Sequence, residues 1–493
     1  MELYQSRLLK KRNNKLKMKR FIINGLVGLV LLLSISVKAQ HQELSEKALV
    51  YKGKQNTTED STSLLHAFKA GSFHGHFRYF LMSTQNKKGL TDYYANATGG
   101  GIRYETAKFH GFQMAVSGFY IFNIGSSDFT KPDAATGQYN RYEIALFDVT
   151  DPANKKDLDR LEEFYIKYNF KNSNIVFGRQ LINTPFINLQ DGRMRPTGVE
   201  AFWVEVNEIK KTKIEGGWVY AISPRGTVKW DDVGGSIGIN PAGVNVDGTK
   251  ALYADNIESK GVAVLGITIN INKKIKLQGW NMFTQNVFNT AMLQADINLP
   301  VKEDADLFGG LQLLRQDAVN YGGNTNPSKT YFTKGQKSII FGSRFGWKNK
   351  RWETSINYNR ITSDGRYLVP REWGREPFFT FMPRERNDGF GNVYAIMAKV
   401  NYNFPKARVK AALAVGYYKL PDVKDYRLNK YGLPSYTQLN ADVRYSFAGM
   451  MKGLEAQLLV VGKLRDGETY NNEKFEFNKV DMVTYNFVLN YHF

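Results

Sequence analysis

The feature that most constrains this chain is an alternation of apolar and polar residues with a period of two, which recurs through most of its 493 residues. Residues 164–170 and 394–404 show it clearly, because every second side chain is apolar and the face between them is more polar. Such a period is typical of a β-strand that presents one face to an apolar environment. Similar segments recur about 18 times, although 16 strands also fit, so the pattern predicts an all-β protein.

The connections between these segments alternate in length. Short turns lie near Asn172, Lys211, Lys273, Asn349, Pro405 and Met451. Long polar loops lie between them, near residues 125–159, 224–259, 317–336, 364–391 and 420–434. Tight turns at one end and long loops at the other are typical of a transmembrane up-and-down antiparallel β-barrel of the outer membrane. A barrel of about 18 strands is wide enough for an aqueous lumen, so the pattern also predicts a channel.

The C-terminal segment "VTYNFVLNYHF" fits the closing strand of such a barrel. One face carries alternate apolar residues, and the chain ends on the last of them: Val483, Tyr485, Phe487, Leu489, Tyr491 and Phe493. At the edge of a soluble sheet this face would promote aggregation. In a barrel it faces outer-membrane lipid, and its terminal aromatic residue resembles the signal that directs such proteins to the barrel assembly machinery. Lipid and that machinery, through Phe493, are therefore expected partners.

The N-terminal 39 residues resemble a cleavable signal peptide. A basic stretch at 17–20 precedes an apolar run over 21–33, and Ala39 marks the expected cleavage point. At about 13 residues, the apolar run is short for a membrane helix. Residues 1–17 are then an upstream extension, or the true start is Met18.

Cleavage would leave two regions. Residues 40–67 are polar and lack the alternation, which predicts a flexible periplasmic lead-in. Residues 68–493 form the predicted barrel domain, in the outer membrane of a Gram-negative bacterium. A lead-in of about 28 residues is too short for a globular plug, which argues against a plugged transporter.

The chain carries a formal net charge of +21, to which residues 1–39 contribute nine Lys or Arg and one Glu, so the remainder carries +13. An exported basic protein of this kind is expected to interact with anionic lipid headgroups and with small anionic or zwitterionic solutes. Nucleic acid is not an expected partner. The chain has no cysteine, which excludes disulfides.

No motif in the sequence indicates an enzyme or a cofactor. The chain has six histidines, and none stands in a recognisable arrangement of nucleophile and base. His74 and His76 share one face of the first strand, but the sequence marks no third ligand, so a pair that lines the lumen is the simpler interpretation. No metal, cofactor or chemical step is therefore expected.

One loop between two predicted strands is unusually apolar. The stretch "INTPFINLQDGRMRPTG", residues 182–198, carries four large apolar side chains among its turn formers: Phe186, Ile187, Leu189 and Met194. Because a solvated loop gains little from such side chains, we expect them to pack against the inner wall of the barrel. This packing would place the charged residues of the loop beside the water path: Asp191, Arg193 and Arg195.

A second loop combines arginines with aromatic residues. The stretch "RYLVPREWGREPFFTFMPRER", within 364–391, interleaves Trp373 and three phenylalanines with five arginines: Arg366, Arg371, Arg375, Arg384 and Arg386. Taking the more apolar strand face as the lipid side places further cations on the lumen side, among them Arg344 and Arg444. In a narrow pore mouth such side chains attract carboxylates or phosphates and orient them by bidentate hydrogen bonds.

With both loops in view, the sequence resembles the OprD-like family of substrate-specific outer-membrane porins. The resemblance rests on "GSFHGHFRYFLM", "FGRQLINTPFINLQDGRMRPTGVEAFWVEV", "EWGREPFFTFM", "YTQLNADVRYSFAGMMKGLEAQLLV" and the aromatic C-terminus. It implies an 18-stranded monomeric barrel whose third and seventh external loops fold inward. It also implies a channel that passes small carboxylate-bearing nutrients along a ladder of basic residues. The resemblance assigns a solute-guiding role to Arg193, whereas the role of Arg195 rests on its chemistry alone.

The sequence therefore predicts an outer-membrane porin for passive, selective diffusion of small polar solutes, with carboxylate-bearing nutrients as the expected cargo. Loops 182–198 and 364–391 would narrow the lumen, and nine residues would line the solute path: Asp191, Arg193, Arg195, Arg344, Arg371, Arg375, Arg384, Arg386 and Arg444. An anion- or phosphate-selective porin is one alternative. A barrel that serves as a surface adhesin or binding protein is another.

Overall fold

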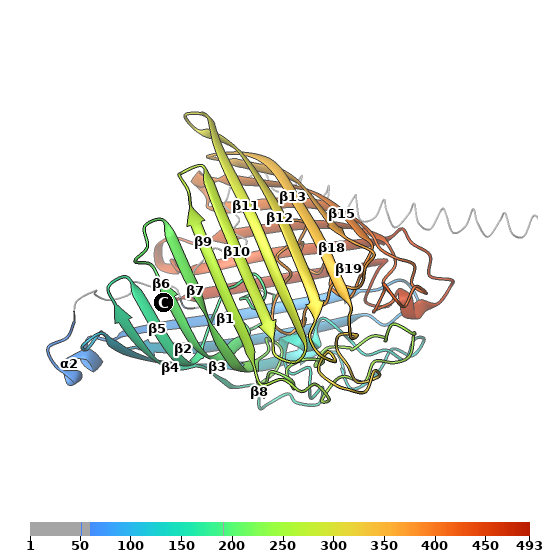
Figure 1. Ribbon diagram of the computed structural model, residues 1–493, viewed down its shortest axis with the longest axis horizontal. Helices are drawn as coiled ribbons and strands as arrows, with labels where there is room; N and C mark the ends of the chain where they lie inside the picture. Colours follow the sequence, from blue (N-terminus) through green and yellow to red (C-terminus); the bar gives the residue numbers. More distant parts are fainter. Residues whose placement is uncertain (1–50, 52–59, 191) are drawn as a thin grey trace, which may run out of the picture.

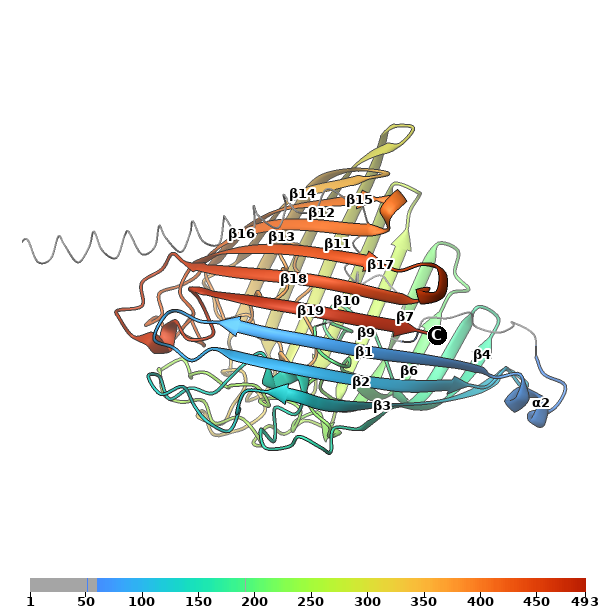
Figure 2. The same ribbon diagram turned by 180° about the vertical axis from the view of Figure 1, so that it is seen from behind.

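A computed structural model of the protein describes residues 51, 60–190 and 192–493, so the predicted signal peptide lies outside the described residues. Figures 1 and 2 show one closed barrel with long loops gathered at one end. The barrel closes between β1 (Ser72–Gln85) and β19 (Met482–His492), which pair antiparallel along most of their length. The first and last strands of the chain are thus neighbours.

The other strands of the wall follow in chain order, each antiparallel to its neighbours. They are β2 (Tyr93–Glu105), β3 (Phe112–Ser126), β4 (Arg160–Phe170), β5 (Ser173–Gln180), β6 (Gly198–Val206), β7 (Thr212–Ser223), β9 (Val262–Asn270), β10 (Ile275–Thr284), β11 (Phe288–Lys302), β12 (Ala305–Ala318), β13 (Lys337–Asn349), β14 (Trp352–Ile361), β15 (Val393–Phe404), β16 (Val409–Lys419), β17 (Tyr436–Ser446) and β18 (Leu454–Arg465). The short β8 (Asp231–Asp232) lies beside the end of β7, while β7 pairs directly with β9. In the described part of the chain the wall therefore has 18 strands, which confirms the predicted barrel.

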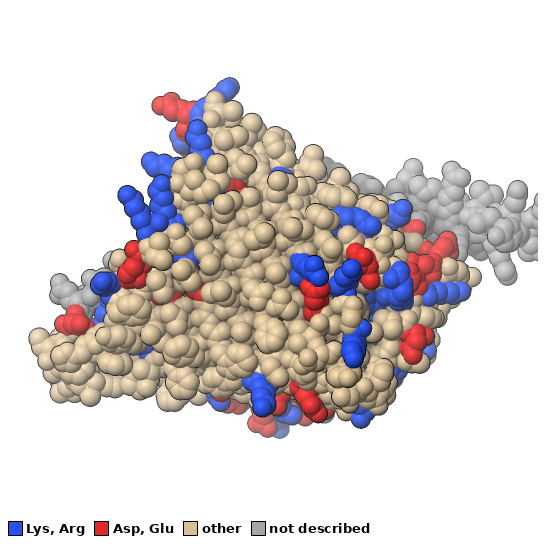
Figure 3. Space-filling view, in the orientation of Figure 1, with Lys and Arg blue, Asp and Glu red and all other residues tan. Residues whose placement is uncertain are grey.

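The alternation along each strand separates a lipid-facing side from a lumen-facing side. In β1, Phe73, Phe77 and Leu81 are exposed on the outside, whereas His76 and Arg78 between them are buried. Figure 3 shows the outside of the barrel as a belt with almost no charged side chains, and Lys, Arg, Asp and Glu gather at its two ends. Such a belt is the surface that a transmembrane barrel presents to the hydrocarbon of a bilayer.

The two ends of the barrel differ as the sequence predicts. At one end the strands are joined by tight turns, such as 171–172 between β4 and β5 and 303–304 between β11 and β12. The other end carries the long loops 127–159, 181–197, 224–261, 319–336, 362–392, 420–435 and 466–481. In outer-membrane barrels the tight turns face the periplasm and the long loops face the exterior.

Part of the predicted flexible lead-in, 40–67, is structured. Leu64–Lys69 form the helix α2, and the Ser63 hydroxyl accepts a hydrogen bond from the amide of His66 at 3.2 Å, as an N-cap does. Tyr51 is buried, and its hydroxyl donates to the carbonyl oxygen of Gly118 at 3.3 Å. The described part of this segment thus includes the start of a helix and a buried tyrosine, and the flexibility of 40–67 stays a prediction. Among the described residues, no helix is long and apolar enough to cross a membrane.

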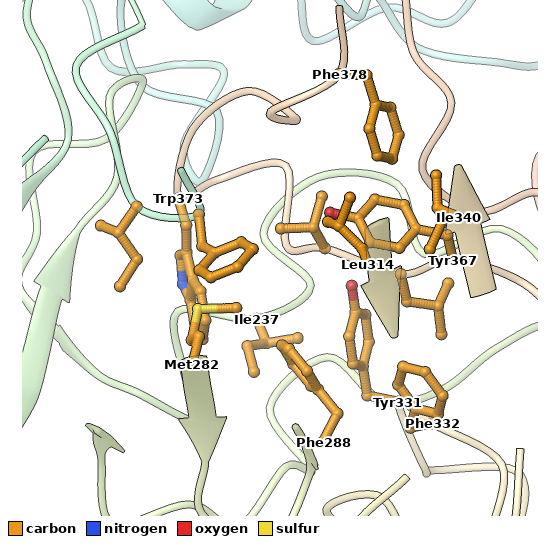
Figure 4. Close-up of a cluster of buried hydrophobic side chains, with 14 of the residues drawn as sticks. Ile237, Met282, Phe288, Leu314, Tyr331, Phe332, Ile340, Tyr367, Trp373 and Phe378 are labelled. Atoms are coloured by element: carbon orange, nitrogen blue, oxygen red, sulfur yellow. The ribbon is translucent and has the colours of Figure 1, made fainter. Parts of the chain in front are cut away.

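The largest apolar core lies inside the barrel, where external loops pack onto strands. Figure 4 shows loop residues such as Tyr331, Phe332 and Trp373 among the strand residues Met282 and Leu314. Trp373 and Phe332 are fully buried. Burying one such aromatic side chain stabilises the packed state by about 1.5–3 kcal/mol, so this cluster anchors the loops inside the lumen.

Candidate functional site

The loop between β5 and β6, residues 181–197, is folded into the barrel. Its apolar side chains Phe186, Ile187, Leu189 and Met194 are all at most 4% exposed. Phe186 and Ile187 belong to the large cluster around Trp373, and Met194 belongs to a second cluster with other buried apolar side chains of the barrel. Their packing against the interior is therefore what holds the β5–β6 loop inside the lumen.

The loop between β14 and β15, residues 362–392, lies against the β5–β6 loop. Asn188 donates from Nδ2 to the carbonyl oxygen of Arg375 at 3.0 Å and accepts the amide of Arg375 at Oδ1, also at 3.0 Å. The amide of Asn188 donates to the carbonyl oxygen of Trp373 at 3.1 Å, and the Thr197 hydroxyl donates to that of Glu372 at 2.8 Å. Together with a longer bond from Nη1 of Arg384 to the carbonyl oxygen of Gly192, at 3.5 Å, these hydrogen bonds join the described parts of the two inward loops.

A buried ionic network stiffens the β14–β15 loop. Asp388 accepts from Nε of Arg371 at 3.0 Å and from Nη1 of Arg386 at 3.4 Å. Burial opposes ionisation of Asp388, but Arg371 and Arg386 hold its pKa below the ordinary value. Glu376 accepts the amides of Asn387 and Asp388 at 2.7 and 2.8 Å. Two of the arginines in this loop therefore form ion pairs with one carboxylate of the same loop, which offsets one of their two charges.

The largest cation cluster surrounds a cavity among the external loops, which we call the outer chamber. Its volume is about 1010 Å³, including space open to solvent. Two carboxyl groups, from Glu372 and Glu385, and the ring of Tyr431 contribute to its wall. Its cationic lining is larger and comes from several loops and one strand: Arg141, Arg193, Arg225, Arg371, Arg384, Arg386, Lys463 and Lys479.

Two further cavities continue from the outer chamber toward the short-turn end. The middle cavity shares Gln190 and Arg384 with the outer chamber, and it is also lined by Arg444. The inner cavity, of about 1110 Å³, shares Arg375 and Phe381 with the middle one and is lined by strand residues of the periplasmic half. The shared residues place the three cavities in series along the barrel.

Most of the arginines predicted for the solute path lie along this series. Arg193, Arg371, Arg384 and Arg386 line the outer chamber, and Arg384, Arg375 and Arg444 line the middle cavity. Arg375 and Arg344 line the inner cavity. There, Arg344 donates to Asp296 at 2.8 Å and lies 4.7 Å over the ring of Phe379.

Two predicted residues differ from this group. Arg195 lines none of the three cavities, because its Nη1 donates to the carbonyl oxygen of Leu158 at 3.1 Å and its Nη2 to that of Thr227 at 3.0 Å. Its guanidinium satisfies buried backbone oxygens and fixes the loop, so its expected place in the water path is not supported. Asp191 lies outside the described residues.

Four cations of the outer chamber were not predicted from the sequence: Arg141, Arg225, Lys463 and Lys479. Arg141, Arg225 and Lys479 stand on three separate external loops, and Lys463 stands on β18. Only the packing of these loops over the lumen brings them together. Each is isolated in its own stretch of sequence, so no local pattern marks it.

The crowding of cations shifts their protonation equilibria. Burial, together with Arg384 and Arg225, lowers the pKa of Arg193 well below its ordinary value. Burial and the neighbouring Arg386 lower the pKa of Arg225 to about 9. Both directions have the same physical cause, because burial and neighbouring cations disfavour the charged form of each guanidinium group, so an anion that enters the chamber would be stabilised.

The comparisons with known proteins agree with this geometry. The family described as "outer membrane porin, OprD family" matches residues 127–369. Among solved structures, *Pseudomonas aeruginosa* OccK9 (OpdG) has a TM-score of 0.69 at 13% identity, covering 86% of this chain and 99% of that one. *P. aeruginosa* OpdK, solved with vanillate, has a TM-score of 0.67 at 13% identity with the same coverage.

*Acinetobacter baumannii* OccAB1 has a TM-score of 0.66 at 12% identity, covering 89% of this chain and 99% of that one. A comparison with curated proteins found no match. The structural likeness extends over nearly the full length of these proteins. The sequence match is confined to residues 127–369, which contain the whole β5–β6 loop and the beginning of the β14–β15 loop. This chain therefore has the OprD-family outer membrane porin fold, and residues 127–369 match the model of that family itself.

Proposed function

We propose that this protein is a porin that gives passive, selective diffusion to small polar solutes, chiefly carboxylate-bearing nutrients. The observation that carries the proposal is the series of three cavities through the barrel, each lined by arginines. The guanidinium group binds a carboxylate with two parallel hydrogen bonds. The protein performs no chemical step, and the solute moves down its own gradient.

Selectivity in this proposal arises where the two inward loops meet. Gln190 and Arg384 stand between the outer and middle cavities, and Arg193 contributes its charge on the outer side. The backbone of Arg384 has φ of 71°, a left-handed conformation that is costly for a residue with a large side chain. The presence of arginine in this costly conformation is consistent with a functional need for its charge between the outer and middle cavities.

The solved neighbours support a small solute as cargo. OpdK was crystallised with vanillate, whose carboxylate and aromatic ring illustrate what a barrel of this fold can hold. An anion- or phosphate-selective porin is the second candidate, and the surplus of cations in the outer chamber favours it over an adhesin. The two porin candidates differ only in the anion preferred.

Liposome swelling with a panel of amino acids, sugars, phosphate and small carboxylates tests this proposal. We expect carboxylates to enter faster than neutral sugars of similar size, and Arg193→Ala to lower carboxylate entry while sugar entry is unchanged. Arg427→Ala is the matched control, because Arg427 is exposed on the external loop 420–435 outside the three cavities. Equal entry of all solutes, or no effect of Arg193→Ala, would refute the assignment of the solute path.

Delivery to the outer membrane is part of the same proposal. A signal peptide over 1–39 would export the chain, and Phe493 would address it to the barrel assembly machinery as a monomer. The backbone of Phe493 is paired with Gly75 of β1 in both directions, at 2.8 and 3.1 Å, while its side chain is 65% exposed. Deleting Phe493 is therefore expected to lower the amount of assembled barrel in outer-membrane fractions, whereas Phe493→Trp keeps an aromatic terminus and should preserve it.

A further inference from the structure

The outer chamber contains two kinds of cation. Arg371 and Arg386 share the carboxylate of Asp388, which balances one of their two positive charges within the protein. Glu385, whose carboxyl group lies on the chamber wall, is buried and makes its hydrogen bonds with Asn387 and the amide of Met382. The two ion-paired arginines therefore belong to the framework of the β14–β15 loop.

The second kind lacks a carboxylate partner among the described residues. Arg193 donates from Nη1 to the carbonyl oxygen of Gly192, and Arg225 donates from Nη2 to that of Arg371 at 2.9 Å. Arg384 donates to the side-chain oxygen of Asn486 at 2.5 Å. Each of these three guanidinium groups has a further buried nitrogen without a hydrogen-bond partner in the described structure: Nε of Arg193, Nη1 of Arg225 and Nε of Arg384.

Three more cations extend this unbalanced group. Lys479 donates to the carbonyl oxygen of Lys474 at 2.6 Å, and Lys463 lies 4.9 Å over the ring of Tyr436. Arg141 completes the chamber wall, and within the described part of the chain none of the three forms an ion pair with a carboxylate. Six cations without an ion pair to a carboxylate of the described residues therefore face one space, whose wall also carries the carboxyl groups of Glu372 and Glu385.

We propose that the outer chamber binds solutes that carry two or more oxyanion groups, such as di- and tricarboxylates, in preference to monocarboxylates of similar size. This inference rests on the proposed porin function. One carboxylate has about four lone-pair sites, so it satisfies one or two guanidinium groups and leaves the other cations desolvated. A second and third oxyanion on the same solute reach the remaining cations, because these cations line the same chamber.

The test is the block of single-channel current by acetate, succinate and citrate in planar bilayers at pH 7. Ionic strength is held at about 0.1 M for every solute, where charges more than about 10 Å away are screened. We expect citrate to half-block the channel at a concentration at least about tenfold lower than acetate, with succinate between them. Tenfold corresponds to one additional charge-assisted contact.

Matched substitutions locate the effect in the chamber. Arg225→Gln and Lys479→Gln, made separately, each remove one unbalanced charge and are expected to reduce the citrate-to-acetate ratio at least about threefold. Their controls are Arg427→Gln and Lys424→Gln, which remove the same charges from exposed positions on an external loop. The controls should leave the ratio unchanged, because they remove charge outside the chamber. A general attraction by the charged rim would instead make both kinds of variant reduce the ratio.

The possible results distinguish a failure of this inference from a failure of the proposed porin function. Absence of single-channel steps in the wild type would overturn the porin proposal and this inference with it. Clear steps with equal half-blocking concentrations for acetate and citrate would overturn the inference alone. A preference for citrate that the chamber variants and the rim variants reduce equally would also overturn it, since the selectivity would then belong to the surface as a whole.

Discussion

The side chain of Asn188 forms a reciprocal pair of hydrogen bonds with the backbone of Arg375, both at 3.0 Å, and so joins the two loops that fill the lumen. This pairing works as a short piece of β-ladder between segments 187 residues apart. Because Arg375 lines both the middle and inner cavities, the position of its side chain depends on Asn188.

Asn188→Ala is expected to loosen the contact between the loops. It removes two side-chain hydrogen bonds that each contribute about 1 kcal/mol, and it leaves the buried amide of Arg375 unsatisfied. We expect more frequent current fluctuations in single-channel recordings. Asn326→Ala, at an exposed loop position, is the control, and equal noise in both variants would show that Asn188 does not set the loop geometry.

Phe186→Ala is expected to release the β5–β6 loop from the inner wall. Removing a fully buried phenylalanine costs about 3–5 kcal/mol through lost contacts and the cavity that remains. The measurable result is cleavage of the β5–β6 loop by protease in the otherwise intact barrel. Phe186→Leu retains most of the volume and should remain protected, and protection of Phe186→Ala would contradict the role of this side chain.

Arg384→Asn tests the charge at the narrowing with little disturbance of the backbone. Asparagine tolerates the left-handed conformation that Arg384 adopts, with φ of 71°, better than most residues do. We expect the permeability ratio of chloride to potassium to fall, because the removed cation stands between the outer and middle cavities. Arg384→Lys keeps the charge and should retain most of the ratio.

The β14–β15 loop is expected to become noisier as the pH rises above about 4.5. Burial raises the pKa of Glu385 well above its ordinary value of 4.5, and the neighbouring Glu376 raises it further. The folded loop therefore binds a proton that the unfolded loop releases, so its stability falls as pH rises above 4.5 toward the raised pKa. The pH dependence that Asp388 gives to the stability of the loop has the opposite sign. Its pKa is lowered, so its contribution to stability is lost only when the pH falls below 3.8.

Recording current interruptions as a function of pH tests this prediction. Glu385→Gln has a similar size and cannot ionise, so its interruption rate should be nearly independent of pH in the range where the wild type changes. A wild-type channel whose interruption rate does not increase with pH, or a variant with the same pH profile as the wild type, would contradict the role of Glu385.

The strands of the barrel could be predicted because their signal is local. The period of two in stretches such as 164–170 results from one face meeting lipid and the other meeting the lumen, and each strand carries this signal by itself. The helix Leu64–Lys69 was missed because six residues hold too few turns for a clear helical period.

The candidate site was predictable where its residues share a loop. Arg371, Arg375, Arg384 and Arg386 stand within one aromatic stretch, and that stretch indicated their common location. Arg225 and Lys479 were missed, because contacts between distant loops place them in the same chamber. Arg193 and Arg195 are two residues apart in the sequence, but only Arg193 lines the chamber. Arg195 instead donates to the buried carbonyl oxygens of Leu158 and Thr227, and the positions of these oxygens cannot be read from the sequence.

The central claim is a channel whose lumen is lined by uncompensated cations. The reversal potential of the wild-type protein in a planar bilayer, measured across a gradient of potassium chloride, tests it most directly. We predict discrete conductance steps and a reversal potential displaced toward the equilibrium potential of chloride. A membrane without steps, or a reversal potential displaced toward that of potassium, would contradict the account.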